Sequence, residues 1–317
     1  MSVNKDKSRL WKRDIAASVD LYNDWFIRFA PAAFRTERVK TTAAVKDMFQ
    51  LTASLKTLTP AVLRMHPSVL PALRMSTCPP IARDRLVGLA GVGKSLVGSM
   101  EDGRIPPRMD SAALERDLRR ICEKITALLD RDMLPWLTDR SRPDAATLDR
   151  SATIVADRLC GAQADPIIRN AQEARQLAAI ARWLMRRGYR RIAPHPADQH
   201  PKTMPAGTFA FRMNVRVGPN LGLSIPVDVV VQPKKPRKDR MPILIEAKSA
   251  GDFTNVNKRR KEESDKMGRL KKRFGAATPY VLFLCGYFDG GYLGYEAAEG
   301  IDWVWEHRIG DLARLGL

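Results

Sequence analysis

Three apolar stretches between residues 208 and 248 constrain the fold of this chain more than any other feature. Residues 209–217 alternate large apolar side chains with small or polar ones, which is the period-two pattern of a half-buried strand. Residues 224–232 and 241–248 are mostly apolar, and a basic loop joins them. Together the three stretches predict neighbouring strands of one sheet.

The segments on either side of these strands predict helices that pack on the sheet. Residues 165–188 begin with Asp-Pro and reach a glycine at their end, as expected for helix boundaries. A basic helix is expected over residues 257–274, and the apolar run 280–288 is typical of a buried strand. This order of helix, strands, helix and strand predicts an α/β core.

The first half of the chain has a different pattern of apolar residues and prolines. Residues 112–137 carry apolar side chains at helical spacing, and proline-containing breaks separate the other segments. A chain of 317 residues is long enough for two domains. We therefore expect a mainly helical region over residues 1–160 and a second domain over residues 161–317.

Net charge indicates the class of partner. The chain has 54 Lys and Arg residues against 35 Asp and Glu residues, a formal charge of +19. Much of the excess lies in residues 233–240 and 257–274. Such a surface attracts polyanions, and we favour nucleic acid over an anionic membrane surface or a simple solubility effect. No apolar run approaches the roughly 20 residues of a membrane helix.

Two acids and a lysine fall where the predicted strands would meet. If residues 224–232 and 241–248 form a hairpin centred near residue 237, Asp228 lies beside Glu246. Lys248 is two residues beyond Glu246 and projects from the same face. Unpaired carboxylates are costly in an apolar sheet, and a divalent cation removes that cost. Two carboxylates suit Mg²⁺, which would activate water against a phosphodiester. The alternative is a salt bridge at a strand end.

A third acid comes from the helix before the strands. Glu173 shares a helical stripe with Leu177, Ile180 and Leu184, which places its carboxylate near the face that packs on the sheet. It would reach the metal directly or through water. The alternative is an ion pair with a neighbouring arginine at the edge of the helix.

The stretch Gly88–Ser95, GLAGVGKS, fits the phosphate-loop pattern of nucleotide-binding proteins. That loop needs a buried strand before its first glycine, but the residues before Gly88 are charged and read as helical. We therefore expect no nucleotide cofactor. The favoured interpretation is a helical stretch or loop that its glycines make more flexible, in which Lys94 contacts a DNA phosphate.

Longer stretches carry a resemblance to a known family. They cover residues 21–35, 78–91, 164–173, 225–231, 244–263 and 281–309. They resemble the XamI-like type II restriction endonucleases, and the order of Asp and Glu-x-Lys resembles the PD-(D/E)xK nuclease superfamily. One departure is that Pro226 stands one residue further from Asp228 than in the Pro-Asp form.

The resemblance implies a fold and an activity. The implied fold is a PD-(D/E)xK core, a mixed central sheet flanked by helices, with a largely helical N-terminal region. The implied activity is Mg²⁺-dependent hydrolysis of both strands of duplex DNA at a short palindrome, GTCGAC for this group, leaving 5′-phosphate ends. Asp228, Glu246 and Lys248 are the implied catalytic set. A palindrome cut on both strands is most simply served by a homodimer. Residues 161–317 would then form the catalytic domain, and the helical region over residues 1–160 would have a role in DNA recognition or dimerisation.

The residues after the catalytic strand supply candidate DNA contacts. Asparagine suits adenine, and arginine suits guanine or phosphate. The alternative for each is to cap or solvate the basic helix, and the loop lysines would clamp the backbone or remain solvated. The candidates are Asn255, Asn257, Lys258, Arg259, Arg260, Lys234, Lys235 and Arg237.

The remaining signals bound the other function classes. The four cysteines are far apart and the four histidines form no zinc pattern, so we expect reduced thiols in a cytoplasmic protein and no zinc site. A DNA repair or junction-resolving nuclease, or a non-catalytic DNA-binding protein, stays open as an alternative to a restriction enzyme.

Overall fold

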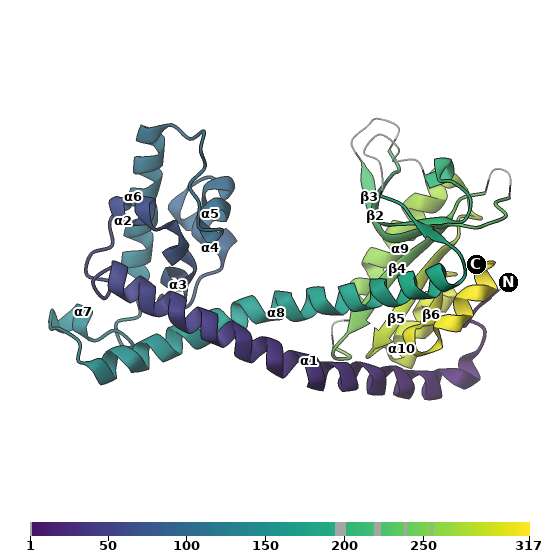
Figure 1. The fold of residues 1–317 in the computed structure, drawn as a ribbon, viewed down its shortest axis with the longest axis horizontal. Helices are drawn as coiled ribbons and strands as arrows, with labels where there is room; N and C mark the ends of the chain where they lie inside the picture. The colour runs from purple at the N-terminus through teal and green to yellow at the C-terminus, as the bar shows by residue number, and fades with distance from the viewer. Residues whose placement is uncertain (1, 194–200, 219–222, 238–239, 255) are drawn as a thin grey trace. The chain divides into compact units, whose positions relative to one another are not determined.

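A computed structural model describes residues 2–193, 201–218, 223–237, 240–254 and 256–317, with backbone only for residues 256–259. The chain forms two compact units (Figure 1). One unit comprises Met1–Phe29 and Arg169–Leu317, and the other comprises Ala30–Ile168. We describe them separately as the sheet unit and the helical unit.

A mixed six-stranded sheet forms the centre of the sheet unit, with its strands in chain order. The pairs β2–β3 and β3–β4 are antiparallel, and the pairs β1–β2, β4–β5 and β5–β6 are parallel. The predicted α/β class is therefore confirmed, with a mixed sheet. The strands are β1 (Arg190–Arg191), β2 (Thr208–Arg216), β3 (Ser224–Gln232), β4 (Ile243–Ala250), β5 (Tyr280–Gly286) and β6 (Asp302–Trp305).

Helices cover both faces of this sheet. The C-terminal part of α8 (Ala145–Arg186) packs Leu177, Ile180 and Leu184 against one face. On the other face, α9 (Val256–Phe274) and α10 (Gly290–Ala298) contribute Met267 and Leu293 to a second core. Side chains alternate along each strand, so both faces of the sheet are apolar and both are buried by a helix.

The beginning of the chain belongs to the sheet unit. The backbone N–H groups of Val3 and Asn4 donate to the Asp302 carboxylate at 2.5 and 2.8 Å, and the Ser18 hydroxyl accepts from the backbone of Gly286 at 2.8 Å. The expected helical region began at residue 1, whereas the compact helical unit begins at Ala30. The reason is that the first turns of α1 (Ser8–Leu51) pack beside β5 and β6.

The long helix α8 differs from its prediction. It begins at Ala145 and continues through Pro166, although Asp165 and Pro166 read as a helix start. A proline inside a helix removes one backbone hydrogen bond but does not forbid the helix when packing holds the turns on either side. The expected end is confirmed, because α8 stops at Arg186 and Gly188 follows with φ of 77°.

The helical unit is built around a separate apolar core. Helix α6 contributes Leu114, Leu118 and Ile121 to this core, and Asp110 caps it by accepting from the Ala113 N–H at 2.9 Å. The short helices of this unit are α2 (Pro60–Met65), α3 (Leu70–Met75), α4 (Arg83–Ala90), α5 (Lys94–Glu101) and α7 (Trp136–Asp139), and α6 spans Ser111–Leu128. Short 3₁₀ segments occur at Pro67–Val69, Pro201–Thr203 and Glu306–Leu315. Within the described part of the chain, no helix has the length and hydropathy of a membrane span.

Candidate active site

Asp228 and Glu246 lie on neighbouring strands of the sheet. Val229 pairs with Ile245 and Val231 with Ile243 in the antiparallel β3–β4 ladder. This register centres the connection near residue 237, as predicted, and puts Asp228 next to Glu246. The ladder ends at Val229 and Ile245, so both acids lie just past the last β3–β4 pair, while Glu246 remains paired with Leu282 of β5.

A side chain replaces the missing ladder bond at this point. The backbone N–H of Ala247 donates to Oδ2 of Asp228 at 2.8 Å. On the other side of β3, Arg212 stands opposite Asp228 with φ of 51°, a left-handed conformation that is unfavourable for residues other than glycine. Regular pairing on both sides of β3 is therefore interrupted at Asp228. The bond from the Ala247 N–H ties the Asp228 carboxylate to the neighbouring strand β4.

Two ammonium groups converge on one oxygen of Glu246. Nζ of Lys248 lies 3.0 Å from Oε1 of Glu246, and Nζ of Lys266 lies 2.5 Å from the same oxygen. The shared face of Glu246 and Lys248 is therefore confirmed. Glu246 is only 3% exposed, and its second oxygen, Oε2, is buried and has no hydrogen-bond partner among the described residues. The protein itself therefore leaves this oxygen unsatisfied.

The surroundings of Asp228 and Lys248 shift the pKa of each group. Burial, and then the charge of Glu246, raise the pKa of Asp228 to about 6. Burial lowers the pKa of Lys248, but the carboxylates of Glu246 and Glu263 outweigh it, so the net pKa is raised. Lys248 is thus held as an ammonium at neutral pH, whereas Asp228 lacks enough nearby positive charge.

These residues fit a hard divalent cation. The buried, unpartnered Oε2 of Glu246 and the raised pKa of Asp228 are both relieved by a cation between the two carboxylates. Oxygen donors of this kind suit Mg²⁺. No group of three or more His, Cys, Asp or Glu side chains in the described residues is arranged to hold a metal. A metal at this site would therefore draw its remaining ligands from water and substrate.

A second buried acid supports Lys248 from behind. Oε1 of Glu263 in α9 lies 3.8 Å from Nζ of Lys248, and the Tyr292 hydroxyl donates to Oε2 of Glu263 at 2.5 Å. Glu296 of α10 is also fully buried, and burial followed by the charge of Glu263 raises its pKa to about 8. Glu296 therefore keeps its proton to a higher pH than an ordinary glutamate, and Glu263 is the acid that faces Lys248.

Glu173 is placed differently from the other predicted site residues. Its Oε1 accepts from Nε and Nη2 of Arg212 at 3.1 and 2.8 Å, on the edge of the sheet beside Asp228. Its charge raises the pKa of Asp228, but only as the smallest of the contributions. The structure thus brings Asp228, Glu246 and Lys248 together and pairs Glu173 with an arginine, so a direct role at the metal stays a prediction.

Comparison with known proteins identifies the family. The model of the XamI restriction endonuclease family matches residues 53–305 of the chain. The type II restriction enzyme SalI of Streptomyces albus G is 54% identical over 314 residues, which cover 99% of this chain and 99% of that protein. No solved structure matches the chain. The chain belongs to the XamI restriction endonuclease family.

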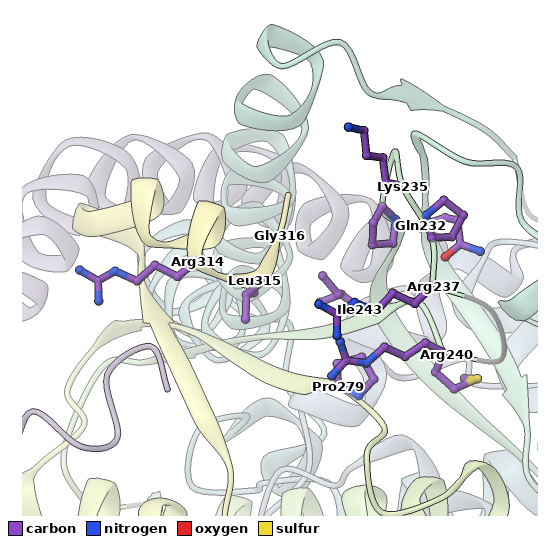
Figure 2. Close-up of a pocket in the computed structure, with 12 residues that line it drawn as sticks. Gln232, Lys235, Arg237, Arg240, Ile243, Pro279, Arg314, Leu315 and Gly316 are labelled. Atoms are coloured by element: carbon purple, nitrogen blue, oxygen red, sulfur yellow. The ribbon is translucent and has the colours of Figure 1, made fainter. Parts of the chain in front are cut away.

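Within this family member, the basic loop after β3 lines a pocket at the far end of the strands. Lys235 and Arg237 border a cavity of about 630 Å³ together with Arg240 and Arg314 (Figure 2). The loop begins after Gln232, four residues beyond Asp228, which is about 13 Å along an extended strand. Lys234 lies 5.5 Å from the centre of the Tyr189 ring. Lys234, Lys235 and Arg237 therefore gather near the basic pocket and not at the carboxylates.

The candidate DNA contacts after β4 are only partly visible. Asn255 and the side chains of Asn257, Lys258 and Arg259 lie outside the described residues. The guanidinium of Arg260 stacks on the Tyr295 ring, 3.6 Å from its centre. This contact positions Arg260 within the protein, and its proposed role on DNA stays a prediction.

The sequence interpretation missed Lys266 and Glu263. Both lie on α9, on the side that also carries the buried residues Met267 and Leu270. The available signal was their spacing, because positions 263, 266, 267 and 270 share one helical face. A charged pair on an apolar face indicates a buried electrostatic role.

Proposed function

We propose that this protein is a type II restriction endonuclease that hydrolyses both strands of duplex DNA. Support comes from its membership of a restriction endonuclease family and from its 54% identity to the type II restriction enzyme SalI across nearly all of both chains. We propose GTCGAC as the palindrome, a PD-(D/E)xK catalytic core, Mg²⁺ as the cofactor and 5′-phosphate ends as the products.

The proposed chemistry divides between the carboxylates and the lysine. Asp228 and Glu246 would hold Mg²⁺, which when bound lowers the pKa of an attacking water and neutralises charge on the leaving oxygen. Lys248 is kept protonated by Glu246 and Glu263, so we assign it to charge stabilisation at the phosphorane and to orientation of the water, not to proton abstraction. Lys266 shares Oε1 of Glu246 and holds that carboxylate in place.

The observation that carries this proposal is the meeting of Asp228, Glu246 and Lys248 beside one unsatisfied buried oxygen. Its test is incubation of the protein with Mg²⁺ and a plasmid of known sequence, followed by mapping of the ends. Discrete fragments with 5′-phosphates at GTCGAC are expected. Structure-dependent nicking would instead favour a repair or junction-resolving enzyme.

Substitutions test the residue roles separately from the activity. Glu246→Ala and Lys248→Ala should lower the cleavage rate by at least about 100-fold and leave duplex binding within about threefold, because electrostatic groups of this kind act on the transition state. Lys12→Ala, at an exposed position in the first turns of α1, is the matched control and should keep the cleavage rate. Cleavage that survives in Glu246→Ala would remove the assignment of the site.

The assembly and the domain roles are part of the same proposal. A homodimer would present one active site to each strand of the palindrome. Residues 161–317 would carry the catalysis, and residues 1–160 would carry recognition or dimerisation. Asn255, Asn257, Lys258, Arg259 and Arg260 are proposed DNA contacts, because they follow the catalytic strand directly. Analytical ultracentrifugation of the protein, alone and with duplex DNA, tests the dimer. A monomer in both conditions and at all concentrations would exclude it.

A further inference from the structure

The stretch GLAGVGKS does not form a phosphate loop in this structure. Gly88 lies inside α4, Gly91 is the residue that ends that helix, and Lys94 is the first residue of α5. A phosphate loop joins a buried strand to a helix. Here the residues directly before Gly88 are helical, as the sequence analysis expected, so the stretch has a different structural purpose.

The stretch is the turn of a two-helix motif with short helices. Helices α4 and α5 have eight residues each, and the three residues Gly91–Gly93 join them. Gly91 has φ of 62° and ψ of 40°, the left-handed conformation that a glycine adopts without strain. A turn of three or four residues containing a glycine between two helices is the arrangement of a helix-turn-helix.

The burial pattern agrees with that motif. Six apolar residues of α4, the turn and α5 point into the core of the helical unit, and each is less than 9% exposed, whereas Val87 is partly buried and Leu89 is 39% exposed. The turn itself is held closed by the Val92 side chain between the helices and by the Val92 N–H donating to the Val87 carbonyl at 3.3 Å. The buried set is Leu86, Ala90, Val92, Leu96, Val97 and Met100.

Charged contacts fix the second helix at both ends. Arg74 of α3 donates twice to the Glu101 carboxylate at the end of α5, at 2.6 and 2.8 Å. At the start of α5, Lys94 lies 3.5 Å from Asp84 of α4. A bidentate arginine pair with both side chains largely buried restrains orientation as well as position. The end of α5 is therefore held to α3 by a buried pair, whereas the Lys94–Asp84 pair at its start is largely exposed.

The outward side of α5 is small and polar. Lys94 and Ser95 are exposed, and Gly98 and Ser99 are partly exposed, one turn further along the same side. Eight residues of helix span about 12 Å, close to the roughly 12 Å width of the DNA major groove. Small side chains allow the helix backbone to approach base edges, and serine and lysine supply hydrogen bonds to bases and phosphates.

We propose that α4 and α5 form a DNA-binding helix-turn-helix, with α5 as the recognition helix that enters the major groove of duplex DNA. Lys94 contacts guanine or phosphate at the first turn of α5, and Ser95 and Ser99 contact base edges. This inference rests on the proposed function for its ligand, duplex DNA, and it adds a specificity-determining surface in the helical unit to the chemistry of the sheet unit.

The test measures duplex binding by the full chain without divalent metal, and cleavage with Mg²⁺. Lys94→Glu and Ser95→Glu place a carboxylate on the proposed surface, and both positions lie in the first turn of α5, where an acid is compatible with the helix. The matched control is Lys46→Glu, because Lys46 is 61% exposed and 3.8 Å from Asp149, whereas Lys94 is 69% exposed and 3.5 Å from Asp84.

We expect Lys94→Glu and Ser95→Glu each to weaken duplex binding at least tenfold. Lys94→Glu should also lower the salt dependence of binding, because it removes a contact to phosphate. Lys46→Glu should bind within about twofold of the unmodified chain. Thermal unfolding by circular dichroism verifies that the variants fold, and Lys94→Ala gives a milder second measurement in the same direction.

Three outcomes overturn the inference, and they are distinguishable. If the unmodified chain cleaves DNA and all α5 variants bind and cleave like Lys46→Glu, the helix-turn-helix assignment fails and the proposed function stands. If the unmodified chain neither binds nor cleaves duplex DNA, both fail together. Tight binding of ATP that is lost in Lys94→Ala would also overturn it in favour of a nucleotide site.

Discussion

The protonated Glu296 carboxyl should make the stability of this protein decrease at alkaline pH, and Glu296→Gln should remove that decrease. Glu296 is fully buried beside Glu263, and its pKa is raised from 4.5 to about 8. An acid whose pKa is raised by folding binds its proton more tightly in the folded protein than in the unfolded chain. The stabilisation from this proton is complete below pH 4.5 and is lost as pH rises through about 8.

The magnitude follows from the same two values. Each pKa unit corresponds to about 1.4 kcal/mol, so the full difference between 4.5 and about 8 has an upper value of about 5 kcal/mol. Part of this difference comes from the charge of Glu263, and we therefore expect about 2–3 kcal/mol to be attributable to Glu296. Glutamine keeps the shape of the protonated acid and replaces its O–H donor with an N–H donor, but it cannot ionise.

The assay is urea denaturation of both proteins at pH 5 and at pH 9. The free energy of unfolding of Glu296→Gln relative to the unmodified chain should be close to zero at pH 5 and should rise by about 2–3 kcal/mol at pH 9. Glu299→Gln removes an exposed carboxylate from the end of the same helix and should show no such rise. A constant difference between Glu296→Gln and the unmodified chain at both pH values would refute the reasoning.

Two further substitutions probe the ion pairs that the structure adds to the sequence analysis. Lys266→Met should lower the free energy of unfolding by about 1–3 kcal/mol in EDTA, because the buried Glu246 loses a charged partner. Mg²⁺ should restore part of the lost stability. An equal loss with and without Mg²⁺, in paired thermal melts, would argue against a role that Lys266 and Mg²⁺ share at Glu246. Arg74→Lys should cost about 1–2 kcal/mol in urea denaturation, because lysine cannot make the bidentate contact with Glu101; no change would show that α5 is held by its apolar contacts alone.

The predicted strand register succeeded because it depended on short-range rules. The side-chain period of two and the symmetric position of the loop near residue 237 together placed Asp228 next to Glu246, and the ladder from Val229 to Ile245 has that register. The same-face relation of Glu246 and Lys248 follows from the period alone, and their 3.0 Å contact agrees with it.

Local rules left two outcomes open. Asp165 and Pro166 are typical of a helix start, yet α8 begins at Ala145 and continues through them. The stripe of Leu177, Ile180 and Leu184 does face the sheet, and the Glu173 carboxylate pairs with Arg212 of β2, so its role at a metal stays a prediction. Propensity and spacing describe what a segment can do, and a partner from another strand decides which option is used.

By itself, the sequence determined the α/β class of the sheet unit, the pairing of the two acid-bearing strands and the polyanion-binding character of the surface. Periodicity and net charge carry these properties, and neither depends on distant contacts. Only the tertiary structure decided which groups surround Glu246 and Lys248, because Lys266, Glu263 and Glu296 arrive from two helices later in the chain. The energy of a buried charge depends on every group within a few ångströms, and that set is defined only when the chain is folded.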